Sequence, residues 1–246
     1  MSPAVVITGA ASGIGRATAL AAARAGYDLI AWDIQGDLLG ELAAQVEVAI
    51  TTDSFDVTDG AARRRALEAA RLDHPVIAGF VHAAGVSGPE PISTFTPESW
   101  GRTIDINLTT AAAMTHELAE DLAASGRGSI VYISSVEGWF GHEWLPAYCS
   151  SKAGLLGLAR AAGMELARRN VRVNCVCPGA IETPMLQPLL DSTEFTERTV
   201  SRTPLGRIGQ PDDVADVIMF LLSNQSRFVT GTSLIVDGGL TSIGGI

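Results

Sequence analysis

The chain contains 246 residues, 47% of which are hydrophobic, and it carries a formal net charge of −10. This length is enough for one large core, and α/β folds of this size often remain a single domain. The negative charge argues against a sequence-independent grip on nucleic-acid phosphates. No apolar run reaches the ~20 residues that span a bilayer, and the glycine-interrupted N-terminus does not resemble a secretion signal. We therefore expect no nucleic-acid or membrane partner.

Short apolar runs alternate with longer helical patterns along the whole chain. The predicted strands are Ala4–Thr8, Asp28–Trp32, Ala49–Phe55, Val76–His82, Ser129–Ser134, Arg172–Val176 and Ser233–Val236. The predicted helices are Gly13–Ala25, Gln35–Val46, Asp59–Leu72, Pro97–Ala124, Pro146–Arg169 and Pro211–Ser223. Strands that are apolar on both faces and alternate with helices are typical of a parallel sheet covered on both sides. The predicted fold class is therefore α/β, a single-domain doubly wound (Rossmann-type) sheet of about seven parallel strands, with helices on both faces, over residues 1–246.

One segment departs from this alternation. Between Pro178 and Gly209, prolines, threonines and an irregular pattern predict a long excursion from the sheet. Long loops in compact domains often act as functional lids, so residues 178–209 are expected to border the substrate.

The cysteines indicate a reducing environment and no metal site. Three are too few for a disulfide framework, and the odd count leaves one unpaired. Cys175 and Cys177 form a C-x-C inside an apolar run, without a His or a further Cys pair near enough to suggest a metal. Both are expected to pack in the core on a strand. The interpretation is a soluble, reduced and cytoplasmic protein.

The first predicted strand runs directly into a glycine-rich turn and then into a helix. Gly9, Gly13 and Gly15 fall in this turn, together with Ser12 and Ile14. Glycines let backbone N–H groups approach a pyrophosphate closely, and the helix N-terminus adds a partial positive charge of roughly half a unit. The G-x-x-x-G-x-G spacing differs from the G-x-G-x-x-G fingerprint. Its place between the first strand and the following helix, and the close backbone approach that its glycines allow, nevertheless match a dinucleotide site. A merely tight strand–helix turn is the alternative.

Asp33 follows the second predicted strand and favours NAD over NADP. A carboxylate there is placed to hydrogen-bond the ribose hydroxyls of an adenosine, and it would repel a 2′-phosphate. No Arg or Lys stands in the glycine turn before Arg16, or just after Asp33, to receive that phosphate. The alternative is that Asp33 merely caps the next helix.

Tyr148 and Lys152 stand four residues apart in a predicted helix and therefore lie on one face of it. A free tyrosine has a pKa of ~10, so it is a poor base at neutral pH, and a neighbouring positive charge favours its phenolate. Such a pair is suited to moving a proton to or from an alcohol oxygen. Because Y-x-x-x-K also arises by chance, its meaning depends on the other motifs.

Several further motifs occur in order around this pair. The full set is Thr8-Gly9-x-x-x-Gly13-Ile14-Gly15, Asp56-Val57, His82-Ala83-Ala84-Gly85, Asn107, Ser135, Tyr148-x-x-x-Lys152, Pro178-Gly179 and Val236-Asp237-Gly238-Gly239. Together they resemble the single-domain short-chain dehydrogenase/reductase family, and the resemblance covers essentially the whole chain.

The resemblance implies the catalytic roles. Tyr148 would be the general acid/base on the substrate oxygen, with Lys152 lowering its pKa and holding the nicotinamide ribose. Ser135, selected over Ser134 by the family spacing to the tyrosine, would hydrogen-bond the same oxygen. Asn107 would hold a water that joins Lys152 to solvent. A polar side chain that bonds its own backbone turn is the alternative for Asn107.

The resemblance also implies the cofactor contacts beyond the glycine turn. Asp56 and Val57 would contact the adenine, and the backbone of Ala83, Ala84 and Gly85 would approach the adenosine ribose. Tyr148 and Lys152 would contact the cofactor as well. The residues implied for the nicotinamide follow the sixth strand and are Pro178, Gly179, Ile181 and Thr183.

The chain departs from the family at His82 and Ala83, where two asparagines are common. The change removes an amide that usually braces the central strands. His82 could replace part of that hydrogen bonding, or it could be a satisfied core histidine. The departure puts local packing in doubt more than catalysis.

The family builds its substrate pocket from three loops, which here are Val86–Phe95, Val136–Ala147 and Ile181–Thr203. The second loop places Trp139, Phe140 and Trp144 beside the expected serine and tyrosine. Apolar pockets with a few polar groups suit cyclic or aromatic ketones and secondary alcohols. Packing in a lid or a subunit interface is the alternative, and Glu137, His142 and Glu143 of this loop could contact a polar substituent.

The sequence therefore predicts an NAD(H)-dependent oxidoreductase that transfers hydride between nicotinamide and a small secondary alcohol or ketone, cyclic or aromatic. The resemblance implies a homotetramer formed through the helices that bear Asn107 and Tyr148. The alternatives are a non-catalytic NAD-binding or scaffold protein of the same fold and an NADPH-dependent carbonyl reductase. An epimerase or dehydratase usually needs a larger substrate domain, for which 246 residues leave little room.

Overall fold

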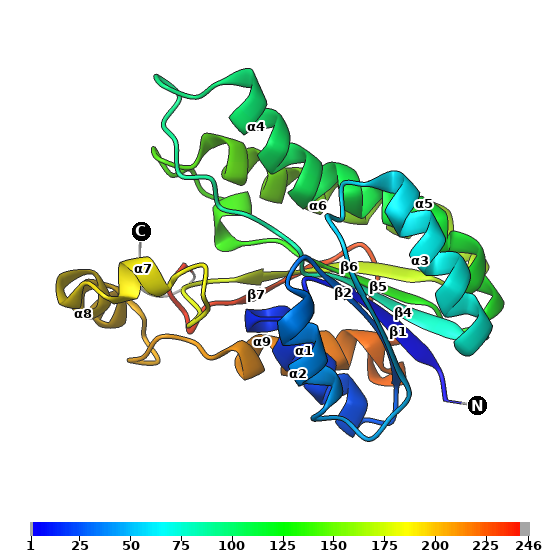
Figure 1. Cartoon of the computed structure of the whole chain (residues 1–246). Coiled ribbons are helices and arrows are strands. Elements are labelled where there is room, and N and C mark those ends of the chain that lie inside the picture. The colour runs from blue at the N-terminus through cyan, green and yellow to red at the C-terminus, as the bar shows by residue number, and fades with distance from the viewer. Residues whose placement is uncertain (1, 242–246) are drawn as a thin grey trace.

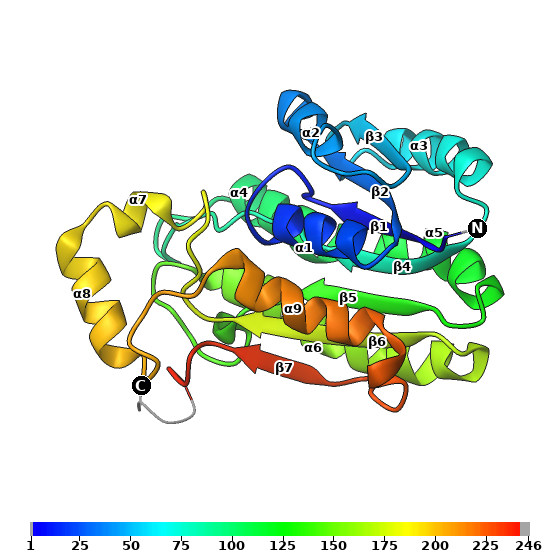
Figure 2. The same ribbon diagram turned by 90° about the horizontal axis from the view of Figure 1, so that it is seen from below.

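The computed structural model describes residues 2–241. Within this range seven parallel strands form one sheet, in the order β3-β2-β1-β4-β5-β6-β7 (Figures 1 and 2). The strands are β1 Ala4–Thr8, β2 Asp28–Asp33, β3 Ile50–Ser54, β4 Ile77–His82, β5 Ser129–Ile133, β6 Arg172–Pro178 and β7 Ser233–Val236. The predicted α/β class and its parallel sheet are confirmed.

Helices cover both faces of the sheet. On one face lie α1 Gly13–Arg24, α2 Gly36–Ala43 and α9 Pro211–Leu222 (Figure 1). On the other lie α3 Gly60–Asp73, α4 Pro97–Ile104, α5 Thr110–Ala124 and α6 Pro146–Leu166. Successive strand residues point to opposite faces, so Val5 and Ile7 pack in one core while Ala4 and Val6 pack in the other. Two buried faces explain why the strands read as continuous apolar runs.

The core also accounts for two of the cysteines. Cys175 and Cys177 are buried on β6, on the same side of the sheet. The Sγ atom of Cys175 lies 3.4 Å from the carbonyl oxygen of Leu155 on α6. The predicted core packing of both cysteines is confirmed.

None of the helices between residues 2 and 241 is long and apolar enough to cross a membrane.

Two segments differ from the predicted elements. The single predicted helix Pro97–Ala124 is interrupted by a π-helical turn, Asp105–Thr109, between α4 and α5. The Thr110 hydroxyl donates to the Asp105 carbonyl oxygen at 2.8 Å and so fills part of the widened turn. π-Helical turns of this kind often occur at functional sites. The excursion after β6 is not wholly irregular, because it contains α7 Gln187–Leu190 and α8 Thr193–Arg202, which lie beyond the end of the sheet (Figure 2).

The strand order creates a topological switch point. From β1 the chain builds outward to β3 on one side and then from β4 to β7 on the other. Sheets of this kind bind ligands beyond the carboxyl ends of their strands at the switch point. Thr8 and His82 are paired in register at the ends of β1 and β4. A ligand-binding site is therefore expected at the residues that follow β1 and β4.

Candidate active site

The glycine turn joins β1 to α1 at the switch point. Gly9 and Gly13 have φ angles of +69° and +52°, a conformation that L side chains rarely adopt. A Cβ on Gly15 would overlap the carbonyl oxygen of Gly9. Ser12 is the N-cap of α1, yet its side chain makes no capping hydrogen bond, and the first turn of this helix holds no acidic residue. The first N–H groups of α1 are thus left for an anionic ligand such as a phosphate.

Asp33 is buried at the end of β2, beside the glycine turn. Its Oδ2 accepts the N–H of Ala11 and its Oδ1 accepts the N–H of Gln35, both at 3.0 Å. The N-cap of α2 is Gln35, so Asp33 does not cap that helix as the alternative proposed. Each carboxylate oxygen keeps a lone pair for a further donor. The guanidinium of Arg16 donates one hydrogen bond, to Gln45 Oε1 at 2.7 Å.

His82 is buried and hydrogen-bonded through both ring nitrogens. Its Nδ1 lies 3.0 Å from Thr8 Oγ1, and its Nε2 lies 3.1 Å from the carbonyl oxygen of Ile106. A carbonyl oxygen only accepts, so Nε2 carries the proton and Nδ1 accepts from the threonine. Burial, reinforced by the charge of Lys152, lowers the pKa of His82 to about 3. His82 is thus a satisfied, neutral core histidine, and it links β1 to the turn that carries Asn107.

Asn107 lies buried in the π-helical turn and ties two other segments together. Its Nδ2 donates to the Val86 carbonyl oxygen and to Ser151 Oγ, both at 3.0 Å, while its Oδ1 accepts the Val86 N–H at 2.9 Å. These partners lie outside the turn, so the alternative of local backbone bonding is wrong. A Cβ on Gly85 would lie 3.3 Å from Asn107 Oδ1 and 3.5 Å from Lys152 Nζ, which places the three residues together. The water between Asn107 and Lys152 stays a prediction.

Tyr148 and Lys152 meet at the start of α6, against the end of β5. The Nζ atom of Lys152 lies 5.3 Å from the centroid of the Tyr148 ring and donates to the Ile133 carbonyl oxygen at 2.8 Å. Lys152 is buried, and burial lowers its pKa to about 8. The predicted helical face that brings the two side chains together is therefore present.

Burial dominates the pKa of Tyr148 in this structure, and the predicted effect of Lys152 on the phenol stays a prediction. Burial raises the pKa of Tyr148 to about 12, hydrogen bonding with Ser135 lowers it, and the charge of Glu137 raises it further. The ammonium of Lys152 is instead bound to the Ile133 carbonyl oxygen, and desolvation outweighs the favourable contacts of the phenolate. Ser135, rather than Lys152, is the group that favours the phenolate here.

Glu137 joins this group, although the sequence indicated it only as one of three polar loop residues. Its N–H donates to Ser135 Oγ at 3.1 Å, and its Oε2 lies 3.8 Å from the Sγ of Cys149. Burial raises the pKa of Glu137, while the nearby His142 lowers it. The signal for its role was its position two residues after Ser135 in the chain.

The predicted adenosine contacts lie on the loops after β3 and β4. Asp56 accepts both the N–H and the hydroxyl of Thr58, and these bonds lower its pKa. Val57 is buried beside it. The N–H of Ala84 donates to Thr8 Oγ1 at 3.4 Å. The loop after β4, which begins with Ala83, therefore lies beside the end of β1.

The predicted nicotinamide contacts follow β6, which itself ends at Pro178. The N–H of Gly179 donates to the Val236 carbonyl oxygen at 3.0 Å. Ile181 is buried in the core. Thr183 faces the glycine turn, because a Cβ on Gly13 would lie 3.2 Å from its Cγ2. The structure therefore brings the turn after β1 and the start of the excursion together.

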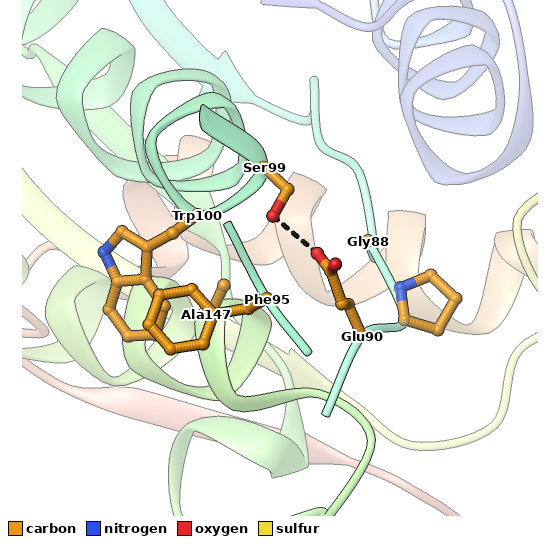
Figure 3. A pocket seen from close by; sticks show the side chains of 7 residues that line it. Gly88, Glu90, Phe95, Ser99, Trp100 and Ala147 are labelled. Carbon is orange, nitrogen blue, oxygen red and sulfur yellow. Dashed lines mark hydrogen bonds between the residues drawn. The ribbon is translucent and has the colours of Figure 1, made fainter. Parts of the chain in front are cut away.

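The predicted aromatic wall is more open than expected. Trp139, Phe140 and Trp144 are 52%, 37% and 53% exposed. A cavity of about 280 Å³ lies on the neighbouring wall (Figure 3). The residues that line it are Gly88, Pro89, Glu90, Phe95, Ser99, Trp100 and Ala147. Sequence reasoning missed Ser99 and Trp100, although the capping box formed by Thr96 and Ser99 signals where α4 starts.

The fold and this site define a dinucleotide-binding oxidoreductase, and similarity to known proteins gives the family. The family model described as "Enoyl-(Acyl carrier protein) reductase" matches residues 9–241. The chain is 39% identical to a 3-oxoacyl-[acyl-carrier-protein] reductase of Thermotoga maritima, with 96% of each protein covered. It is 37% identical to a (3R)-3-hydroxyacyl-CoA dehydrogenase of Rattus norvegicus, covering 96% of this chain and 95% of that protein.

The solved structures agree with this assignment. The crystal structure of levodione reductase matches with a TM-score of 0.92 and 30% sequence identity, and 96% of each chain is covered. The chain belongs to the short-chain dehydrogenase/reductase family. It is therefore an oxidoreductase that acts on hydroxyl or keto groups with a nicotinamide cofactor. Among residues 2–241, no three His, Cys, Asp or Glu side chains gather where they could hold a metal ion.

Proposed function

We propose that the chain is an NAD(H)-dependent dehydrogenase/reductase that interconverts a secondary alcohol and its ketone, with Tyr148 as the general acid/base. The observation that carries this proposal is the convergence of Ser135, Tyr148 and Lys152 at the end of β5. The ammonium of Lys152 lies 5.3 Å from the phenol ring, and the Ser135 side chain acts to lower the pKa of the phenol. Binding alone would require neither the serine nor the tyrosine, so this arrangement disfavours a scaffold protein.

The residues at the switch point fit a dinucleotide. The glycine turn leaves the N-terminus of α1 without a side-chain cap, which suits a pyrophosphate. Gly85 keeps the space beside Asn107 and Lys152 free of a side chain. When bound, the nicotinamide cofactor supplies or accepts the hydride. The ammonium of Lys152 has three N–H donors, one of which is bonded to the Ile133 carbonyl oxygen. The other two are available for hydroxyl groups of a ribose.

In this proposal, Tyr148 and its neighbours move the proton. For alcohol oxidation the phenolate would take the alcohol proton, while the Ser135 hydroxyl holds the same oxygen. For ketone reduction the phenol would donate its proton to the carbonyl oxygen. Because the pKa of Tyr148 is about 12 here, a further positive charge, such as that of an oxidised nicotinamide, would be needed to populate the phenolate near neutral pH. Alcohol oxidation should therefore become faster as the pH rises.

Asp33 supports NAD over NADP. Its buried carboxylate is fixed by two backbone N–H groups, at the place where a 2′-phosphate would add further negative charge. No Arg or Lys stands in the glycine turn before Arg16, or just after Asp33, to receive that phosphate. An NADPH-dependent carbonyl reductase is the alternative that a cofactor comparison would reveal.

Two substrate classes are in competition. The exposed aromatic loop after β5 favours a cyclic or aromatic ketone. The similarity to proteins named for 3-oxoacyl and 3-hydroxyacyl thioesters favours an acyl thioester as the second candidate. A homotetramer formed through the helices that bear Asn107 and Tyr148 is also part of the proposal, and light scattering tests it. The cytoplasmic location stays a prediction.

The test is a screen of the purified chain with NAD and with NADP. The alcohols should include cyclic, aromatic and linear examples, with 3-hydroxybutyryl-CoA as the thioester, and the readout is NADH or NADPH fluorescence. We expect turnover with NAD to exceed turnover with NADP for any accepted alcohol. A preference for NADP contradicts the assignment of Asp33, and the absence of turnover across the screen favours the non-catalytic alternative.

A further inference from the structure

The cavity lined by Glu90 and Trp100 is formed by two separate segments of the chain. Gly88–Glu90, Phe95, Ser99 and Trp100 come from the loop after β4 and from α4, while Ala147 comes from α6 (Figure 3). Ala147 directly precedes Tyr148 on α6, while Tyr148 itself does not line the cavity. A substrate that spans both places would have its oxygen at Tyr148 and its far end in this cavity.

Hydrogen bonds fix the wall of the cavity. The N–H of Glu90 donates to the Trp144 carbonyl oxygen at 2.8 Å, which joins the loops after β4 and β5. The Ser99 hydroxyl donates to Glu90 Oε2 at 2.5 Å. Ser99 is itself held by the capping box that it forms with Thr96 at the start of α4. The carboxylate of Glu90 therefore has a defined position, and Figure 3 shows it pointing towards Ser99.

The cavity combines one carboxylate with an aromatic pair. The rings of Phe95 and Trp100 lie 5.5 Å apart at an angle of 51°, and both side chains face the cavity (Figure 3). Aromatic faces attract cations, and an ionised carboxylate accepts hydrogen bonds but donates none. No Lys, Arg or His is among the residues that line this cavity in the described part of the chain. An anionic group would therefore meet repulsion and find no partner here.

We propose that this cavity is a substrate subsite that selects for a hydrogen-bond-donating, non-anionic substituent, with an ammonium group preferred over a hydroxyl. Glu90 is the specificity-determining residue, and Phe95 and Trp100 supply the apolar and cation-attracting wall. The inference rests on the proposed function, because it places the reacting carbon at Tyr148.

A purely structural role for Glu90 makes a different prediction. If Glu90 only braces α4 through Ser99, then Glu90→Gln should change stability or overall activity without changing the order of substrates. Gln keeps an acceptor for the Ser99 hydroxyl but removes the charge. The variant therefore separates the charge of Glu90 from its hydrogen bond.

The experiment uses three ring ketones that differ in one substituent: 4-aminocyclohexanone, 4-hydroxycyclohexanone and 4-oxocyclohexanecarboxylate. For each, kcat/KM is measured by NADH oxidation at neutral pH and low salt. Affinity for the NADH-loaded enzyme is measured separately by calorimetry. The variants are Glu90→Gln, Trp100→Leu and the control Glu98→Gln, which removes an exposed carboxylate from the first turn of the same helix.

For the wild type we expect the amine to be preferred over the carboxylate by about thirtyfold in affinity, decreasing with added salt. Glu90→Gln should reduce that ratio to about threefold, Trp100→Leu should weaken binding of the amine, and Glu98→Gln should leave the ratio unchanged. Equal affinities for the three ketones, whether all bind or none does, overturn the subsite. If the charge order holds in binding while none of the ketones is reduced, the subsite stands and the proposed reaction fails.

Discussion

The cofactor side and the substrate side of this site are built in different ways. On the cofactor side, buried polar groups hold one another: Asp33 accepts two backbone N–H groups, and His82 is bonded through both ring nitrogens. On the substrate side, Trp139 and Trp144 are more than half exposed, at 52% and 53%. Buried polar groups must find partners, whereas exposed loop residues have few such constraints. The cofactor side is therefore fixed by the core, and the substrate side is set by its loops.

Lys152 is where the two sides meet, so its replacement should have the largest effect. Lys152→Met removes the ammonium beside the Tyr148 ring and the donors proposed for a ribose. We expect kcat/KM to fall by about a thousandfold, and the affinity for NADH to fall as well. Steady-state kinetics and NADH fluorescence titration measure the two effects. Arg160→Met, which removes an exposed cation from the same helix, is the control; unchanged NADH affinity in Lys152→Met would argue that the lysine serves only the phenol.

On the cofactor side alone, Asp33→Asn should alter the choice of cofactor. The amide keeps one acceptor oxygen but removes the charge that repels a 2′-phosphate. The ratio of kcat/KM for NAD to that for NADP should fall by about tenfold, which corresponds to ~1.4 kcal/mol. Asp37→Asn, at an exposed position in the first turn of α2, should leave the ratio unchanged. The assignment fails if both variants show the wild-type ratio.

His82 tests whether the cofactor side is part of the core. The pKa of His82 is lowered to about 3, whereas an imidazole in an unfolded chain has a pKa of ~6.5. Between these values the unfolded chain binds more protons, so the free energy of unfolding should fall as the pH falls through this window, by up to ~1.4 kcal/mol per pH unit.

Urea unfolding of the wild type and of His82→Asn across this pH range measures the difference in slope. The variant should lose less stability on acidification than the wild type, even if it is less stable at neutral pH. His116→Asn, at an exposed position of α5, should keep the wild-type slope. Parallel curves for the wild type and His82→Asn would show that His82 is not held neutral by burial.

The smallest expected effect is on the substrate side, at Glu137. Its charge raises the pKa of Tyr148, so Glu137→Gln should lower that pKa. The pH at which alcohol oxidation reaches half its maximum rate should therefore move down by about half a unit. Glu143→Gln, in the same loop, is the control. A shift towards higher pH in Glu137→Gln would contradict the effect of the Glu137 charge on the pKa of the phenol.

The difference between the buried cofactor side and the exposed substrate side explains which features could be predicted from the sequence. The alternation of apolar runs and helices predicted the sheet, because both faces must be buried. The spacing of Tyr148 and Lys152 predicted their meeting, because helical geometry determines it. The π-helical turn around Asn107 could not be predicted, since it follows from tertiary contacts with Val86 and Ser151 rather than from local preference.

The protonation states and the cavity were likewise beyond the sequence. The spacing of Tyr148 and Lys152 indicated a lowered pKa for the phenol, but burial raises it and depends on the packing of the whole site. The cavity at Glu90 and Trp100 depends on how the loop after β4 and the helices α4 and α6 pack together. The hydrophobic pattern of the sequence does not predict this packing. Its only local signal was the capping box at the start of α4.

The most direct test of the central claim uses one preparation of Tyr148→Phe. NADH binding is titrated by fluorescence, and NADH formation is measured with an alcohol that the wild type accepts. The variant removes only the phenolic oxygen at a half-buried position, so it should bind NADH with nearly wild-type affinity. We predict that NADH formation is abolished while binding survives. Undiminished turnover in Tyr148→Phe would contradict the assignment of this tyrosine as the general acid/base.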